Sequence, residues 1–170
     1  MAESEGPQAG VSHPRAPVEY FGQEKAGVLI LGIGNAMRAD DGVGPFVAAR
    51  LAEAGLPARA HEGDGTGVID AMAEAAHLVL VDATASGAAP GHRSMLDGLQ
   101  PVPAEFFHYS THRFGVAEAV ETARALGLLP ARLTIHGIEG ADFSAGERLS
   151  APVADAAGAL ISELLQEFAG

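Results

Sequence analysis

Apolar positions divide the chain into alternating strand-like and helix-like segments. Residues 28–34 and 78–82 are continuous apolar runs, which are typical of strands buried on both faces. Weaker patterns predict further strands at residues 59–62, 94–96 and 133–138. Apolar residues at helical spacing predict helices over residues 43–54, 68–76, 114–126 and 150–168. This order predicts a three-layer α/β fold, in which a mostly parallel twisted sheet of about five strands carries helices on both faces.

The chain divides into a tail and one domain. Residues 1–26 are rich in Gly, Pro, Ala, Ser and Glu and show no periodicity, so we expect a flexible N-terminal tail. We expect residues 27–170 to form a single α/β domain. Apolar residues make up 48% of the sequence and aromatic residues only 5%, so its core must be aliphatic.

Charge and cysteine content narrow the possible functions. The net charge of −12 would repel duplex DNA and anionic membranes, so we expect no nucleic-acid or membrane partner, while a protein partner remains open. The absence of cysteine excludes disulfides, thiolate metal sites and a cysteine nucleophile. No apolar run is long enough to span a bilayer and no signal peptide opens the sequence, so we expect a cytoplasmic protein.

Candidate chemistry lies where ligands bind in such sheets, beyond the carboxyl ends of the strands. Asp40 and Asp41 follow the first strand, Asp82 ends the strand at 78–82, and His112 precedes the helix at 114–126. Each has a structural alternative. The first two acids suit the start of a helix, Asp82 suits a loop cap, and a lone loop histidine is usually incidental. His108 and His112 have the spacing of a helical metal pair, but the prolines at 101 and 103 argue against a helix there.

Other catalytic and binding motifs fit poorly. A dinucleotide fingerprint would require a glycine where Met37 stands, and two carboxylates would face the pyrophosphate. The sequence contains no G-K-[ST], G-x-S-x-G or H-E-x-x-H motif. We interpret the remaining strand and edge histidines as structural residues without partners; they are His61, His77, His92 and His136.

Residues 62–67 form a glycine-rich loop that has two interpretations. It is either a turn in which Thr66 caps the following helix, or a wall that lets a substrate backbone approach closely. Periodicity and composition do not separate these interpretations.

Taken together, these segments resemble the hydrogenase maturation protease family from about Val28 to Phe168. The resemblance rests on three motifs in order: Gly32-Ile33-Gly34-Asn35 with Asp40-Asp41-Gly42-Val43-Gly44, then Leu78-Val79-Leu80-Val81-Asp82-Ala83, then Ser110-Thr111-His112-Arg113-Phe114-Gly115. In that family an acid after the first strand, an acid ending a central strand and a histidine before a helix form a metal-binding trio. The resemblance assigns these roles to Asp41, Asp82 and His112. The family's acid in the glycine-rich loop maps to Glu62, with Asp64 as its rival.

The resemblance implies an endopeptidase that removes the C-terminal extension of the [NiFe] hydrogenase large-subunit precursor after nickel insertion. The trio would complete the coordination of nickel that the precursor supplies, and the metal would polarise the scissile carbonyl or activate water. A rival mechanism makes Asp41 or Asp82 a general base without metal contact. No organic cofactor is implied. We expect client specificity in residues 100–111 and 137–150.

Two other classes of function remain at this stage. A non-catalytic nickel-sensing chaperone for the large subunit would use the same trio, and only shortening of the large subunit distinguishes it from a protease. A nucleotide-binding α/β enzyme is disfavoured by Met37 and the acidic pair.

Overall fold

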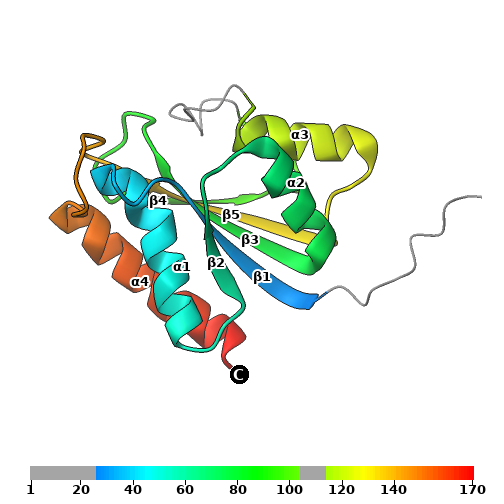
Figure 1. Cartoon of the computed structure of the whole chain (residues 1–170), viewed down its shortest axis with the longest axis horizontal. Coiled ribbons are helices and arrows are strands. Elements are labelled where there is room, and N and C mark those ends of the chain that lie inside the picture. Colours follow the sequence, from blue (N-terminus) through cyan, green and yellow to red (C-terminus); the bar gives the residue numbers. More distant parts are fainter. Residues whose placement is uncertain (1–25, 104–113) are drawn as a thin grey trace, which may run out of the picture.

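A computed structural model describes residues 26–103 and 114–170 and has the predicted α/β fold (Figure 1). The strands are β1 (Ala26–Ile33), β2 (Ala58–His61), β3 (Ala75–Thr84), β4 (Arg93–Asp97) and β5 (Arg132–Glu139). A 3₁₀ turn, η1 (Ala39–Gly42), precedes the helices α1 (Val43–Glu53), α2 (Gly65–Glu74), α3 (Val116–Leu126) and α4 (Ala151–Phe168). The N-terminal tail predicted at 1–26 lies almost entirely outside the described residues.

The five strands form one sheet in the order β2-β1-β3-β5-β4. Neighbouring strands are parallel except β4, which runs antiparallel to β5 at one edge. The carboxyl ends of β1, β3 and β5 therefore point the same way. In the register of β3 and β5, Asp82 lies opposite Gly137 and Thr84 lies opposite Glu139.

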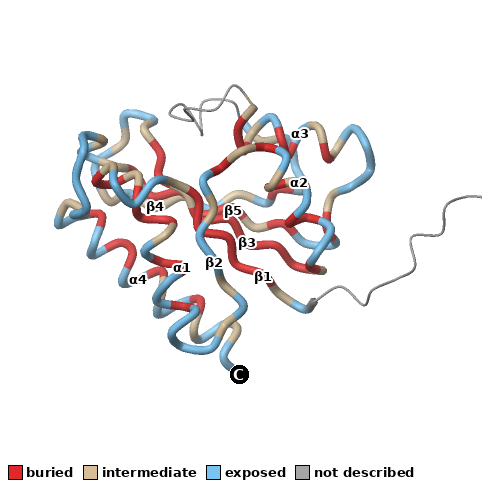
Figure 2. The backbone as a smooth tube through the Cα atoms, in the orientation of Figure 1, coloured by how far each residue is buried: buried red, intermediate tan, exposed pale blue. Residues whose placement is uncertain are grey.

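Helices cover both faces of the sheet, with α2 and α3 on one side and α1 and α4 on the other (Figure 1). Alternate residues of β3 serve the two cores, because successive strand side chains point to opposite faces. Leu78 and Leu80 pack with α2 and α3, whereas Val79 and Val81 pack with α1 and α4. The buried residues are concentrated along the central strands (Figure 2). Both cores are aliphatic, as the composition predicts.

Glycines allow α1 to lie directly against the ends of β1 and β3. A Cβ at Gly44 would lie 2.2 Å from the Ile33 carbonyl oxygen and 2.5 Å from that of Val81. Gly34 has φ of +134°, and a Cβ there would lie 1.9 Å from the Asp41 carbonyl oxygen. This close contact holds η1, which carries Asp41, against the carboxyl edge of the sheet.

The cap predicted for α2 is wrong. Thr66 lies inside α2, and Asp64 caps that helix by accepting a hydrogen bond from the Gly67 N–H at 2.9 Å. Ser150 occupies the N-cap position of α4, but its hydroxyl donates to Asp40 and accepts no hydrogen bond from a helix N–H. Gly127 ends α3 in the left-handed conformation. Of the helices in the described ranges, none is long and apolar enough to span a membrane.

Candidate active site

Asp41 lies in η1, half-buried, at the carboxyl edge of the sheet. Its Oδ2 accepts a hydrogen bond from the Asn35 N–H at 3.1 Å and lies 3.9 Å from Nη1 of Arg38. Burial raises the pKa of Asp41, against the opposing effects of the Asn35 hydrogen bond and the Arg38 charge. Asp41 therefore lies in the first turn of η1, at the predicted start of a helical segment, but it does not cap α1, whose N-cap is Gly42.

Asp40 has the opposite role, although it is the adjacent residue and has the same side chain. It is fully buried, and its carboxylate accepts four hydrogen bonds from the segment between β5 and α4. The donors are the N–H groups of Ala141, Asp142 and Ser150 and the Ser150 hydroxyl, at 2.7–3.0 Å. Burial raises the pKa of Asp40, but these hydrogen bonds outweigh it and the pKa is lowered. Asp40 is a structural residue.

Asp82 lies near the carboxyl end of β3, two residues before the end of that strand. Its Oδ1 accepts a hydrogen bond from the Ala83 N–H at 2.8 Å. Burial raises its pKa well above the usual range for an aspartate, and the negative charge of Asp41 raises it further. The structure therefore brings Asp41 and Asp82, which are 41 positions apart in sequence, within electrostatic reach of each other. Two such carboxylates resist simultaneous ionisation unless a proton or a cation joins them.

Glu139, which the sequence analysis did not single out, organises the loop that follows Asp82. It is buried at the end of β5 and accepts hydrogen bonds from the Thr84 hydroxyl, the Ser86 hydroxyl and the Gly87 N–H at 2.7–3.0 Å. Burial raises the pKa of Glu139, but those donors more than compensate and it is lowered. A buried acid at a strand end in register with Thr84 is the signal that would have identified it.

The glycine-rich loop forms one wall of a cavity of about 510 Å³ beside Asp41. The cavity is lined by Gly34, Asn35, Ala36, Pro45, Ala60, His61, Glu62 and Asp64. Asn35 connects the two features, because its N–H donates to Asp41 while the residue lines the cavity. Glu62 is exposed, whereas Asp64 is occupied with capping α2 and with the Thr66 hydroxyl. Because α2 begins at Gly65, the predicted loop is in fact only residues 62–64 followed by the first turn of that helix, and a role in substrate binding stays a prediction.

Two histidines predicted to lack partners have them. The His61 Nδ1 accepts a hydrogen bond from the Gly63 N–H at 2.9 Å, and its Nε2 lies 3.5 Å from Oδ2 of Asp64. His77 Nε2 lies 2.9 Å from the Thr134 hydroxyl. His136 is buried, and burial, followed by the charge of Arg93, lowers its pKa to about 4. These partners and positions agree with structural roles.

His112 and His108 fall at 104–113, outside the described residues, so the trio is described only in part. Phe114, two positions after His112, is tied to the start of α2, because its carbonyl accepts a hydrogen bond from the Gly65 N–H at 2.9 Å. Within residues 26–103 and 114–170, no group of three or more histidines and acids is arranged to hold a metal ion.

These observations define an α/β protein with a mostly parallel sheet, at whose carboxyl edge two partly buried acids lie close enough for the charge of Asp41 to raise the pKa of Asp82. The model of the family described as hydrogenase maturation protease matches residues 63–167, more than half of the chain. The chain therefore belongs to the hydrogenase maturation protease family. The matched segment contains Asp82 and His112, whereas Asp41 lies before it.

Individual relatives agree with the family. Over 118 residues the chain is 34% identical to the hydrogenase expression/formation protein HupD of Rhodobacter capsulatus, a match that covers 66% of this chain and 56% of HupD. It is 31% identical over 118 residues to the hydrogenase 2 maturation protease of Escherichia coli. That match covers 65% of this chain and 71% of the Escherichia coli protein. The solution structure of an endopeptidase from Escherichia coli matches with a TM-score of 0.68 at 25% identity, covering 82% of this chain and 90% of the other.

Proposed function

We propose that this protein is an endopeptidase that removes the C-terminal extension of a [NiFe] hydrogenase large-subunit precursor once nickel has been inserted. Family membership supports the class of reaction. The single observation that supports the site is the pair Asp41 and Asp82, whose carboxyl groups lie at one edge of the sheet with both pKa values raised by burial. Perturbed acids that influence each other in this way are more frequent at functional sites than elsewhere.

The proposed role of the pair is to take up nickel that belongs to the substrate. Asp41 and Asp82 supply carboxylate oxygens and His112 supplies an imidazole nitrogen, a donor set that suits a borderline divalent ion. A cation between the two acids would remove the electrostatic cost of ionising Asp82 beside Asp41. The two ionised carboxylates are therefore more favourable with a metal ion between them than without one. A precursor without nickel would leave that cost in place and would bind less favourably. The dependence of cleavage on nickel follows directly from this proposal.

The rival role is proton transfer without metal contact. Because its pKa is raised, Asp82 binds a proton more readily than a normal aspartate, as a general base requires. In this version Asp41 remains ionised and keeps the pKa of its neighbour high. The two versions differ in one measurable property, since only the first requires nickel in the precursor.

The cavity beside Asp41 is the proposed position of the chain segment next to the cut. It is open and is lined by Glu62 and Asp64 of the glycine-rich loop. Exposed Glu62 on its rim favours a basic side chain in the client segment. This placement makes Glu62 a residue for client selection rather than for chemistry.

The deciding experiment mixes purified precursor with purified protein and follows the length of the large subunit by intact mass. Nickel-loaded precursor should be shortened by the wild type and left intact by Asp82→Asn, Asp41→Asn and His112→Ala. Asp97→Asn is the matched control, because Asp97 is an exposed aspartate on the edge strand β4, and it should cleave normally. Nickel-free precursor separates the two roles. If it is cut at the normal rate, the acids act as bases; if the large subunit is bound but never shortened, the protein is a chaperone.

A further inference from the structure

We propose that β4 pairs with β4 of a second copy of this chain, antiparallel and centred on Met95, so that two sheets join into one of ten strands. The proposal concerns a surface away from Asp41 and Asp82 and does not depend on the proposed activity. It rests on the hydrogen-bonding direction of β4, on the exposure of Met95 and on the order of charges along the strand.

The outer edge of β4 presents backbone groups at alternate residues. Towards β5, the Gly98 N–H donates to the Leu133 carbonyl at 2.8 Å, and the His92 carbonyl accepts from the Glu139 N–H at 2.9 Å. These two pairs belong to the same register, in which Met95 lies opposite His136. Antiparallel pairing alternates, so even-numbered residues face β5 and the backbone groups of Arg93, Met95 and Asp97 point away from it. Among the described residues, no strand pairs with this outer edge.

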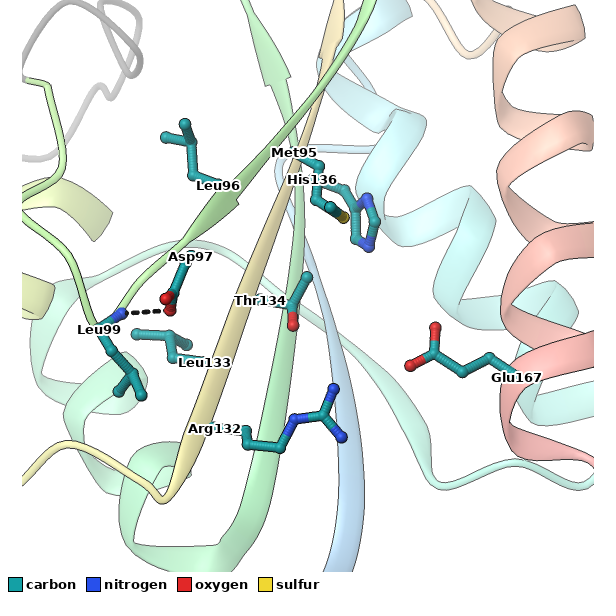
Figure 3. A pocket seen from close by; sticks show the side chains of 9 residues that line it. All are labelled: Met95, Leu96, Asp97, Leu99, Arg132, Leu133, Thr134, His136 and Glu167. Atoms are coloured by element: carbon teal, nitrogen blue, oxygen red, sulfur yellow. Dashed lines mark hydrogen bonds between the residues drawn. The ribbon is translucent and has the colours of Figure 1, made fainter.

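The side chains of these three residues lie on the face of the sheet that carries α4. Arg93 forms a two-pronged ion pair with Glu163 of α4, which fixes this orientation. Met95 lies over His136 beside a cavity of about 490 Å³, and Thr134 and Glu167 also line it (Figure 3). Met95 is 70% exposed, the most exposed of the large apolar side chains among the described residues. Natural edge strands are usually protected by short length, charged side chains, a proline or a bulge. Residues 93–97 contain no proline, lysine or bulge, and the protection that β4 has is its short length and the charges of Arg93 and Asp97.

A two-fold axis through Met95 makes this strand complementary to itself. In that register Met95 faces Met95 of the second copy, and Arg93 faces Asp97 of the second copy on both sides of the axis. Six backbone hydrogen bonds would form from outward-pointing groups only, so the β4–β5 pairing is undisturbed. The Asp97 carbonyl already accepts from the Gln100 N–H at 3.0 Å, but a carbonyl oxygen has a second lone pair. Opposite charges directly across a strand pair are stabilising, and like charges are destabilising.

The charge order is what selects a second copy over another extended peptide. A strand with arginine at one end, an apolar residue in the middle and aspartate at the other end is complementary in charge to an antiparallel copy of itself. The net charge of −12 on each copy opposes association at long range, and five residues form a small interface. We therefore expect a weak dimer, with a dissociation constant of about 10 µM to about 1 mM, rather than an obligate one.

Sedimentation equilibrium of the full chain over that concentration range gives the first test. The wild type should shift from monomer to dimer as concentration rises, whereas Met95→Lys, which places two ammonium groups at the axis, should remain monomeric. Leu126→Lys is the matched control, because Leu126 is 64% exposed at the end of α3 and should dimerise as the wild type does. A wild type that stays monomeric to the top of the range, or a dimer that Met95→Lys leaves intact, overturns the proposal.

The register is tested with single cysteines, since the chain has none of its own. Opposed residues of a hydrogen-bonded antiparallel pair have Cα atoms about 5.5 Å apart, within the reach of a disulfide. Met95→Cys should therefore oxidise to a covalent dimer at least about tenfold faster than Leu126→Cys. Arg93→Cys mixed with Asp97→Cys should form the mixed dimer, while either alone should not, because like positions would lie about 13 Å apart. Equal rates for Met95→Cys and Leu126→Cys, or homodimers of Arg93→Cys, would contradict this register.

Discussion

Asp40 and Asp41 allow a direct test of the claim that adjacent, chemically identical residues have separate roles. The perturbation is Asp40→Asn, which keeps the shape of the side chain but removes its charge. In the wild type one carboxylate oxygen accepts from the Ser150 N–H, and the other accepts from the N–H groups of Ala141 and Asp142 and from the Ser150 hydroxyl. An asparagine has one accepting oxygen. Its amide nitrogen must therefore face at least one of these donors.

The size of the effect follows from those contacts. A hydrogen bond to a charged group contributes about 1.5–3 kcal/mol and one to a neutral group about 0.5–1.5 kcal/mol. With one bond of Asp40 replaced by a donor–donor contact and the remaining three weakened, we expect a loss of about 2–4 kcal/mol in the free energy of unfolding. At a urea m-value of about 2 kcal/mol/M, this lowers the midpoint of unfolding by about 1–2 M. The protein should still be folded in water, because domains have about 5–15 kcal/mol of stability.

Urea unfolding followed by circular dichroism at pH 7 and at lower pH is the measurement. The lowered pKa of Asp40 means that its contribution is present above the unfolded value of 3.8 and is lost as pH falls through the folded value. The difference between wild type and Asp40→Asn should therefore shrink in acid. Asp41→Asn is the control, and it should be at least as stable as wild type because it removes the negative charge beside Asp82.

Either of two patterns of results would refute this assignment. If Asp41→Asn unfolds at a lower urea concentration than Asp40→Asn, then the hydrogen bonds to residues 141–150 do not stabilise the fold in the way described. Equal loss in both variants would mean that the two carboxylates act as one structural unit. In either case Asp41 would no longer stand as the member of the pair that is available for function.

Three further results are expected. Asp82→Asn should stabilise the protein at pH 7 by about 1 kcal/mol or more, because an ionised Asp82 is unfavourable in its buried position beside Asp41. Urea titrations should show this gain in stability disappear as the pH falls through the raised folded pKa and below the unfolded value of 3.8. Gly44→Ala should lower the free energy of unfolding by at least about 2 kcal/mol and displace α1, since its Cβ would meet two carbonyl oxygens. Gly158→Ala, where a Cβ would enter open space beside α4, should instead raise the free energy of unfolding by about 0.5–1 kcal/mol, as measured by thermal unfolding. Glu139→Gln should lower the free energy of unfolding, measured in urea, by about 1–3 kcal/mol and should slow precursor cleavage, because it weakens the hydrogen bonds that hold the loop after Asp82. A variant with normal stability and slow cleavage would instead give Glu139 a direct role in the reaction.

Long-range periodic features of the sequence were predictable because they follow from burial alone. Apolar runs located β1, β3 and β5, and the helical spacing of apolar residues located α1 and α4. Even the weak pattern at residues 59–62 corresponds to a strand, β2. The carboxyl ends of parallel strands meet at one edge, so the proximity of Asp41 and Asp82 also followed from topology.

Polar assignments were less predictable, because a polar side chain can bond to any group that the fold brings near it. Nothing local distinguishes Asp40 from Asp41, since the partners of Asp40 lie 101–110 positions away. Thr66 and Asp64 are both suitable caps by residue type, and only backbone geometry decides between them. His77 has a partner on a neighbouring strand that periodicity cannot identify. Roles that depend on contacts distant in sequence therefore required the structure.

The distance in sequence between Asp40 and its donors has a consequence for synthesis on the ribosome. The turn that carries Asp41 is held by residues 141–150, both through the Asp40 carboxylate and through backbone hydrogen bonds from Ala39 to Gly146 and from Asp40 to Asp142. Those residues are translated more than a hundred codons after the turn itself. A nascent chain therefore cannot complete the turn around Asp41 until residues 141–150 have been translated, and a chain released before that point would lack the contacts that hold this turn.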